Sequence, residues 1–198
     1  MSGAPATARG KLAVPLQPLV PRLELEPPVQ QLLAGLASVE EGLARLEAEA
    51  QLMPACRLVA HALPKREAVW WACMCARAVP DEKAVPLDAA ALEAAETWVR
   101  RPDEAARRAC MAAAEKSNFR STEAWAAVGA FWSGGSMAPE GQPVIPPGDH
   151  LTGTAIAGAV ILAGVRRTPQ HLDARLTRFL ASAREIAAGG AGRMPVEA

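Results

Sequence analysis

Apolar residues recur every three or four positions through most of the chain between residues 28 and 188, which is the spacing of one face of an α-helix. The pattern predicts seven to eight helices, including helices over about 65–79, 87–100, 103–116 and 151–165. No alternating apolar and polar run bounded by turn residues competes with this period. We therefore expect an all-α fold, a single-domain helical bundle.

Local chemistry assigns several helix boundaries within this pattern. Ser38 and Glu41 have the spacing of a capping box, which starts a helix. Pro64 ends the preceding helix and lies in the first turn of the next, where its missing N–H is harmless. Gly189 and Gly190 end the last helix.

Two of the predicted helices are apolar on every side. Residues 68–76 read Ala-Val-Trp-Trp-Ala-Cys-Met-Cys-Ala, and residues 151–165 contain no charged side chain. An all-round apolar helix is typical of a buried, surrounded position. The second stretch is shorter than the roughly 20 residues that a membrane span needs. We expect both helices at the centre of the bundle and no membrane span.

The two ends of the chain lack a helical period. Residues 1–27 carry five prolines and are predicted to form a flexible or extended Pro-rich arm. The leucines and valines of this arm also suit a segment that lies along the domain surface or along a partner. Residues 28–188 form the predicted helical domain, and residues 189–198 a flexible tail.

Composition narrows the function classes. The 21 basic residues balance 21 acidic ones, whereas a general polyanion binder needs surplus positive charge. Nucleic acid is therefore not an expected partner, although arginine pairs gathered on one face would favour it. The N-terminus has no basic head followed by an unbroken apolar stretch, which favours a cytoplasmic location.

No catalytic, cofactor or metal site is predicted. Cys73 and Cys75 would point about 200° apart on a helix, so they cannot easily share a metal ion. The three histidines lie in different segments. Ser136, Asp149 and His150 do not have the arrangement of a catalytic triad.

The most unusual segment is the Gly/Pro-rich stretch at 133–150, predicted to be a stiff loop that ends one helix and crosses the surface. Adjacent tryptophans on a helix cannot face the same way, so one of Trp70 and Trp71 should face a second layer, a groove or a partner. These features define the candidate interaction surface: Trp70, Trp71, Trp132, Ser133, Gly134, Gly135, Ser136, Met137, Pro146, Pro147 and His150.

Four segments together resemble one protein family. They are Ala62–Cys73, Ala94–Val99, Ala130–Pro139 and the run from His150–Gly153 into Ala157–Val160. In their order and their residues these segments resemble the uncharacterised bacterial DUF6931 family, over roughly residues 55–188. The resemblance implies no catalytic residues. It does imply a link to type VI secretion, because members of the family are encoded near type VI secretion genes.

Two main hypotheses of function follow. The first is a non-enzymatic helical interaction protein with a protein partner, such as an accessory, adaptor or chaperone associated with type VI secretion. The alternative is a small-ligand-binding protein or an enzyme, whose pocket near the 133–150 loop would also involve Trp70 and Trp71. A deep polar cavity on which Arg66, Asp149 and His150 converge would favour the alternative.

Overall fold

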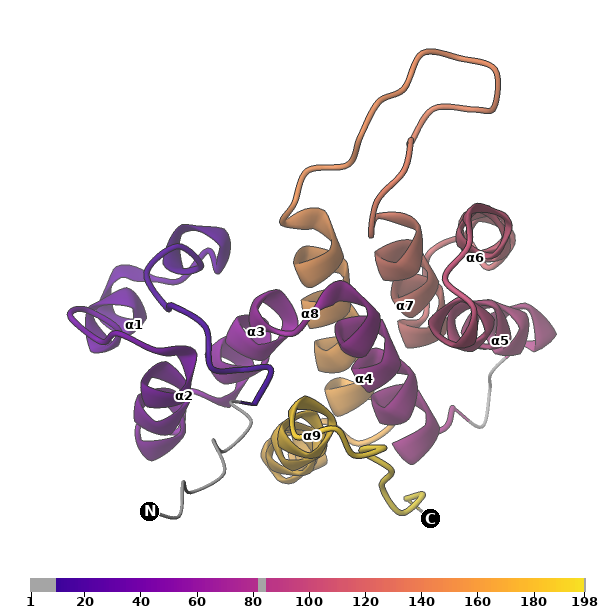
Figure 1. Cartoon of the computed structure of the whole chain (residues 1–198). Coiled ribbons are helices and arrows are strands. Elements are labelled where there is room, and N and C mark those ends of the chain that lie inside the picture. Colours follow the sequence, from indigo (N-terminus) through magenta and orange to yellow (C-terminus); the bar gives the residue numbers. More distant parts are fainter. Residues whose placement is uncertain (1–9, 82–84, 198) are drawn as a thin grey trace, which may run out of the picture.

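The computed structural model describes residues 10–81 and 85–197, and within these ranges the protein is all-α, with no β-strand (Figure 1). The prediction of a single-domain all-α fold is confirmed. Its helices are α1 (Pro27–Leu32), α2 (Val39–Ala48), α3 (Leu52–Ala62), α4 (Lys65–Ala78), α5 (Pro86–Arg100), α6 (Glu104–Lys116), α7 (Thr122–Phe131), α8 (Leu151–Val165) and α9 (Leu172–Ala187), with 3₁₀ turns at Val20–Arg22 and Pro169–His171.

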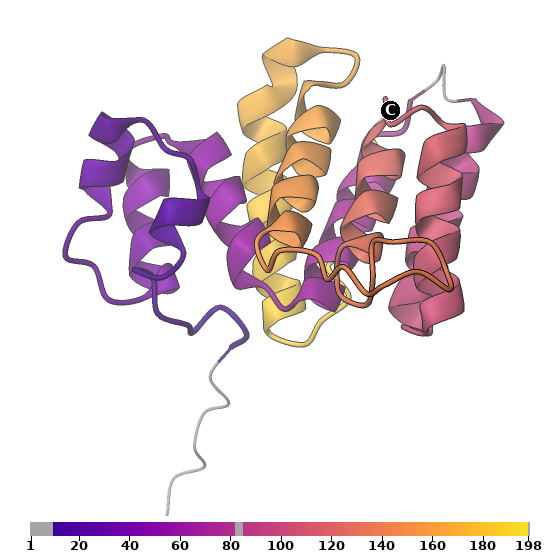
Figure 2. The same ribbon diagram turned by 90° about the horizontal axis from the view of Figure 1, so that it is seen from above.

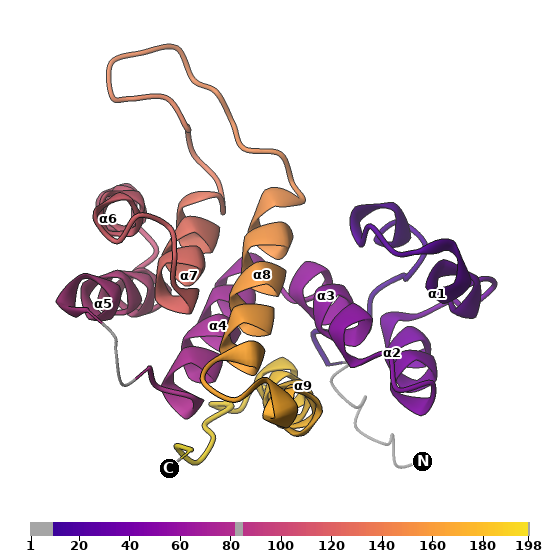
Figure 3. The same cartoon turned by 180° about the vertical axis from the view of Figure 1, so that it is seen from behind.

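Helix α8 lies at the centre of the bundle. It packs against α3, α4, α7 and α9, and α4 in turn packs against α5, α7 and α9. Helices α1 to α3 lie on one side of this centre and α5 to α7 on the other (Figures 1 and 3). The view from above shows α8 and α9 side by side between these two groups (Figure 2). The central placement of the two all-round apolar helices is confirmed.

The predicted capping box starts α2. The Ser38 hydroxyl accepts a hydrogen bond from the Glu41 amide at 3.2 Å, and the Glu41 carboxylate accepts from the amides of Ala37 and Ser38 at 2.8 and 3.2 Å. These backbone hydrogen bonds lower the pKa of the Glu41 carboxyl, since they stabilise its charged form.

Small residues let α8 approach its neighbours closely. A Cβ atom on Gly153 would lie 2.3 Å from Nδ1 of His61 on α3, far inside contact distance. A Cβ atom on Gly158, in the same helix, would meet no atom within 4 Å. Gly153 is therefore needed for the close contact with α3 and Gly158 is not, although the sequence alone does not distinguish them.

The contrast between these glycines is testable. Gly153→Ala is expected to lower the free energy of unfolding by about 1–3 kcal/mol, because the His61 ring must move. Gly158→Ala is expected to raise it by about 0.5–1 kcal/mol, because alanine favours a helix interior. Urea denaturation followed by circular dichroism measures both. Equal effects of the two substitutions would contradict the close approach of α8 to α3.

Within the described ranges, none of the helices combines the length and the apolar character needed to cross a membrane. This holds for α8, the most apolar of them, which has 15 residues.

The N-terminal segment is packed from residue 10 onward. Leu12, Leu16 and Leu23 are buried among the side chains of the core. Backbone hydrogen bonds hold the segment in place: the Leu16 amide donates to the Ala37 carbonyl at 3.0 Å, and the Val39 amide to the Val14 carbonyl at 3.1 Å. Of the arrangements considered for the arm, residues 10–27 thus lie along the domain, and residues 1–9 are outside the described ranges.

The segment after α9 is also packed, which differs from the predicted flexible tail. Gly192 has a positive φ of 63° and turns the chain back toward α9, where its carbonyl accepts a hydrogen bond from Ser182 Oγ at 2.6 Å. Farther on, the Glu197 amide donates to the Ala78 carbonyl at 2.8 Å. Residues 189–197 therefore form part of the surface beside α4 and α9.

Candidate functional site

The 133–150 loop is anchored by a buried arginine of α6. Arg107 donates to the carbonyl of Phe131 at 2.6 Å and to the carbonyl of Ser136 at 2.8 Å. Its guanidinium also pairs with the carboxylate of Glu104, one turn earlier, at 2.7 Å, and lies 4.5 Å from the centroid of the Phe131 ring. Charge-assisted bonds of this kind are stronger than neutral ones, so the end of α7 and the start of the loop are held firmly to α6.

Gly135 is required by this anchor. Its φ of +65° is one that side-chain-bearing residues rarely adopt, and a Cβ atom there would lie 2.8–2.9 Å from atoms of the Arg107 guanidinium. Gly134 has no atom within 4 Å of the same test position. Of the two predicted glycines, only Gly135 lets the loop pass over Arg107.

Ser136 braces the interior of the loop. Its hydroxyl accepts hydrogen bonds from the amides of Ala138 and Ile145, each at 3.1 Å. The Met137 amide donates to the Ile145 carbonyl at 2.8 Å, so the two arms of the loop are joined side by side. At its start, the Ser133 carbonyl accepts from Lys65 Nζ of α4 at 3.0 Å. Ser136 therefore acts as a structural brace within the loop.

The braced loop projects away from the helices (Figures 1 and 3). Two of its apolar side chains are exposed. Val144 is 75% exposed and Ile145 is 54% exposed, the first of them the most exposed large apolar side chain in the described part of the chain. Pro146 beside them is exposed and Pro147 is half-buried. Prolines fix the backbone on both sides of this apolar pair.

Trp132 and His150 lie at the two feet of the loop. Trp132 caps the C-terminus of α7, is half-buried, and meets Trp125 edge to face at a centroid distance of 6.3 Å. His150 is exposed at the N-terminus of α8, with no side-chain cap hydrogen bond.

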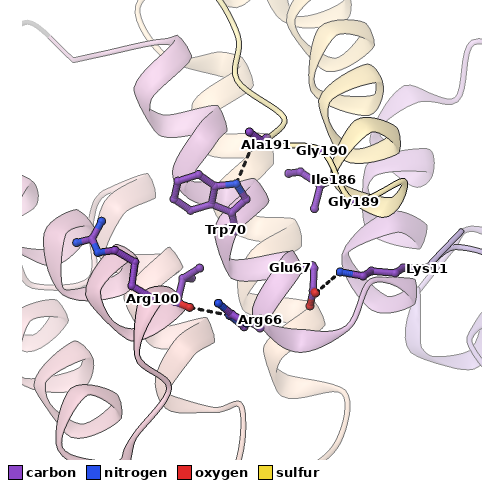
Figure 4. Close-up of a pocket in the computed structure, with 10 residues that line it drawn as sticks. Lys11, Arg66, Glu67, Trp70, Arg100, Ile186, Gly189, Gly190 and Ala191 are labelled. Carbon is purple, nitrogen blue, oxygen red and sulfur yellow. Dashed lines mark hydrogen bonds and ion pairs between the residues drawn. The ribbon is translucent and has the colours of Figure 1, made fainter.

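The two adjacent tryptophans of α4 face in different directions, as predicted. Trp71 is fully buried and donates its indole N–H to the Phe179 carbonyl of α9 at 2.8 Å. Trp70 is half-buried and donates to the Ala191 carbonyl at 2.8 Å. Trp71 is therefore part of the core and does not belong to an interaction surface, whereas Trp70 lines a surface cavity (Figure 4).

The cavity beside Trp70 has a volume of about 360 Å³. Arg66 and Trp70 of α4 line it together with Arg100 at the end of α5 and the chain at 189–191 (Figure 4). Four other well-formed surface cavities lie elsewhere in the described ranges, and residues 133–150 line none of these five. Arg66, Asp149 and His150 thus do not converge on a shared cavity.

The model of a family of unknown function (DUF6931) matches residues 42–187, which is most of the chain. The chain belongs to this family. The matched range runs from within α2 to the last residue of α9. No curated protein and no solved structure matches the chain.

The thiols of this DUF6931 protein are all buried and free. Burial raises the pKa of Cys110 to about 12 and raises the pKa of Cys56, Cys73 and Cys75 further above the ordinary value. Thiols with raised pKa values are poor nucleophiles and poor metal ligands. Within the ranges that the structure describes, there is no group of three or more His, Cys, Asp or Glu side chains that could hold a metal ion.

His61 is the histidine of the DUF6931 protein with a clear electrostatic signature. Burial, and then the nearby charges of Arg22, His150 and Arg57, lower its pKa to about 4. It is therefore neutral at neutral pH and packs against Gly153 of α8. This is a structural position between two helices.

The sequence places the pairs Arg107-Arg108 and Arg166-Arg167 near helix ends or on exposed faces, and in the DUF6931 protein the side chains of Arg107 and Arg166 are buried. Arg107 anchors the loop, and Arg166 forms an ion pair with the buried Glu123 at 2.7 Å while donating to the Val79 carbonyl at 2.8 Å. The side chains of Arg107 and Arg166 are thus not solvated, and both lie beside helix ends, the other position that the sequence favours for these pairs. Their guanidinium groups satisfy carbonyls at helix ends, a need that the sequence does not display.

Sequence reasoning also missed the apolar tip of the loop in the DUF6931 protein. Val144 and Ile145 were not among the candidate residues, although they stand between Pro143 and Pro146 in an otherwise polar stretch. An apolar pair held between prolines is the signal that indicates them. The structure thus groups the predicted loop residues into a brace and adds Val144 and Ile145 as the exposed part.

Proposed function

We propose that this protein is a non-enzymatic helical interaction protein that holds a protein partner with the tip of the 133–150 loop. One observation carries the proposal: Val144 and Ile145 are exposed on a loop that is braced internally and anchored to α6. Apolar side chains on a projecting segment are stabilised when a partner covers them. A braced loop also loses little conformational entropy on binding.

The free energy gained by burying Val144 and Ile145 is of the size expected for a small contact at the centre of an interface. Complete burial of a fully exposed valine or isoleucine side chain contributes about 1.5–3 kcal/mol. Because Val144 is 75% and Ile145 54% exposed, covering each contributes about 1–2 kcal/mol, which is part of the free energy of a micromolar affinity. Binding energy in interfaces is concentrated in few residues of this kind. The remaining loop residues then act as a support.

The class of partner follows from the family resemblance. The resemblance implies that some members of the family are encoded near type VI secretion genes, and on that ground we infer a component of that apparatus as the partner, with this protein as a cytoplasmic accessory, adaptor or chaperone. The five well-formed cavities in the described part of the chain contain no loop residue, so they give the small-ligand or enzyme alternative no support at the loop.

The proposal is tested by affinity capture from the native host. The double variant Val144→Ser with Ile145→Ser is expected to recover at least tenfold less of the specific partner than the unaltered chain, since the exposed apolar contact is lost. Leu87→Ser is the matched control, because Leu87 is an exposed apolar residue of α5 far along the chain from the loop. Circular dichroism checks that both variants are folded.

Recovery of the same partners in the same amounts by the unaltered chain and the double variant would remove the loop tip from the proposal. An equal loss with Leu87→Ser would show that non-specific binding to exposed apolar residues, and not the loop, accounts for the capture.

A further inference from the structure

Two surface cavities adjoin on α4 and share Trp70 and Arg100. Each has a volume of about 360 Å³. The first lies toward the start of α4 and is closed by residues 189–191 after α9. The second continues toward Met74 and Arg77 and is closed by residues 193–196. The two adjoining cavities together are here named the Trp70 groove, and Figure 4 shows the residues of the first.

The floor of the Trp70 groove is apolar and fixed. The hydrogen bond from its indole N–H to the Ala191 carbonyl holds Trp70 in one orientation. Val99 and Ile186 line the groove on one side of the indole, and Met74 and Met194 line it on the other. A rigid tryptophan flanked by methionines suits an apolar side chain of varied shape.

The rim of the Trp70 groove carries surplus positive charge. Its basic residues are Lys11, Arg66, Arg77, Arg100 and Arg193, and its acidic residues are Glu67 and Glu96. The chain as a whole has a formal net charge of zero, so this surplus is a local feature.

The two acidic residues neutralise only part of this charge. Glu67 forms an ion pair with Lys11, and Glu96 accepts two hydrogen bonds from Arg77 at 2.5 and 2.9 Å. Arg100 forms a longer ion pair with the same Glu96 carboxylate, at 3.9 Å.

The other two arginines have no carboxylate partner. Arg66 donates its Nε to the Val99 carbonyl at 2.6 Å, and neither Arg66 nor Arg193 forms an ion pair with any residue in the described ranges. Two exposed guanidinium groups without a carboxylate partner, and a third in a long ion pair, thus surround an apolar floor.

We propose that the Trp70 groove binds an acidic peptide segment that carries an apolar anchor residue. The anchor lies against Trp70, and carboxylates on both sides of it pair with Arg66, Arg100 and Arg193. Guanidinium groups bind carboxylates through paired hydrogen bonds, which gives such a site its preference for Asp and Glu.

A peptide fits the groove better than a nucleic acid does. Glu67 and Glu96 line the groove at its two halves and would repel a continuous phosphate backbone. A peptide can place its carboxylates beside the arginines and its uncharged residues beside the glutamates. The groove shares no residue with the 133–150 loop, so this site is independent of the proposed function.

The test uses a phage-displayed library of random 12-residue peptides selected on the full-length protein. We expect selection to enrich peptides with several Asp or Glu residues around an aromatic or aliphatic residue. Fluorescence anisotropy of labelled copies of these peptides is expected to show affinity at least tenfold weaker for the double variant Arg66→Gln with Arg100→Gln, and similarly weaker for Trp70→Ala. Both arginines are exposed, and circular dichroism checks that the double variant is folded despite the change to the Arg66 hydrogen bond with the Val99 carbonyl.

The matched control is Arg45→Gln with Arg120→Gln, which removes the same charge from exposed positions outside the groove and should leave affinity unchanged. Selection without enrichment of acidic peptides, equal affinity for the groove variant, or equal loss with the control pair would each overturn the proposal. A 20-nucleotide oligothymidylate should bind more weakly than the enriched peptides. If it binds more tightly, and loses that binding in the groove variant, the ligand is a nucleic acid and the proposal fails.

Discussion

Trp71→Ala is expected to lower the free energy of unfolding by about 4 kcal/mol, whereas Trp70→Ala should lower it by only about 1 kcal/mol. Removal of a buried tryptophan leaves a cavity and loses the transfer free energy of the ring. Trp71 is fully buried and also donates a hydrogen bond to the Phe179 carbonyl, so its loss affects the contact between α4 and α9. Trp70 is half-buried at the groove, and its removal opens space to solvent.

Guanidinium denaturation of the two single variants and the unaltered chain, followed by circular dichroism, measures this contrast. Trp71→Phe supplies an intermediate case, since it retains much of the ring volume and removes the N–H. Equal destabilisation by Trp70→Ala and Trp71→Ala would contradict the assignment of one tryptophan to the core and the other to the surface.

The second large effect is expected at Arg175, a buried arginine of α9. Its Nη1 donates to the carbonyls of Gly164, Arg166 and Thr168 at 2.9, 2.5 and 3.3 Å, at the C-terminal end of α8 and just beyond it. Its other two nitrogens pair with the Glu197 carboxylate at 2.7 Å. This one side chain therefore joins α9 to the end of α8 and to the last described residue.

Arg175→Met is expected to lower the free energy of unfolding by about 3 kcal/mol, because buried carbonyls and one carboxylate lose a charged donor. Arg178→Met, in the same helix, is the control. Arg178 makes one exposed hydrogen bond to the Pro195 carbonyl, and its loss should cost less than about 1 kcal/mol. Urea denaturation of both variants measures the difference, and an equal loss would contradict the structural role of Arg175.

The Arg175 effect should also depend on pH. Hydrogen bonds from Arg175, and then from His171, lower the pKa of Glu197 from its ordinary value of 4.5 to about 2. Because the folded carboxyl has the lower pKa, its stabilising contribution is present above about pH 4.5 and is lost as the pH falls toward 2. The difference in stability between the unaltered chain and Arg175→Met should therefore narrow between pH 5 and pH 3.

The sequence predicted those parts of the fold that depend on periodicity and local chemistry. The helical spacing of apolar residues, the capping box at Ser38 and the all-round apolar character of α4 and α8 are local or short-range signals. Each corresponds to a structure that one segment adopts largely for its own reasons. The all-α architecture with a central pair of helices follows from them.

Other features depend on contacts between distant segments and could not be predicted in this way. Prolines interrupt the periodicity before residue 28, yet Leu16 and Leu23 are buried there. The segment after α9 is held mainly by hydrogen bonds to its backbone carbonyls and to Glu197, which leave no apolar pattern.

The candidate site was predicted in outline. The loop at 133–150 was recognised from its glycines and prolines. Its anchor, Arg107, was not, because the sequence does not distinguish a buried arginine from an exposed one. Arg107 is distinguished only by the carbonyls of Phe131 and Ser136 that it reaches. The periodicity could likewise show that the two tryptophans of α4 diverge, but not that Trp71 is the inward one.

Because all four cysteines are buried, we expect the native protein not to react with thiol reagents. Cys56, Cys73, Cys75 and Cys110 are enclosed by the core, and their raised pKa values keep them protonated. A thiol introduced at an exposed loop position, as in Glu140→Cys, would stand alone as a reactive group. A fluorophore or spin label attached there could report on the loop in the intact protein, with every native cysteine left in place.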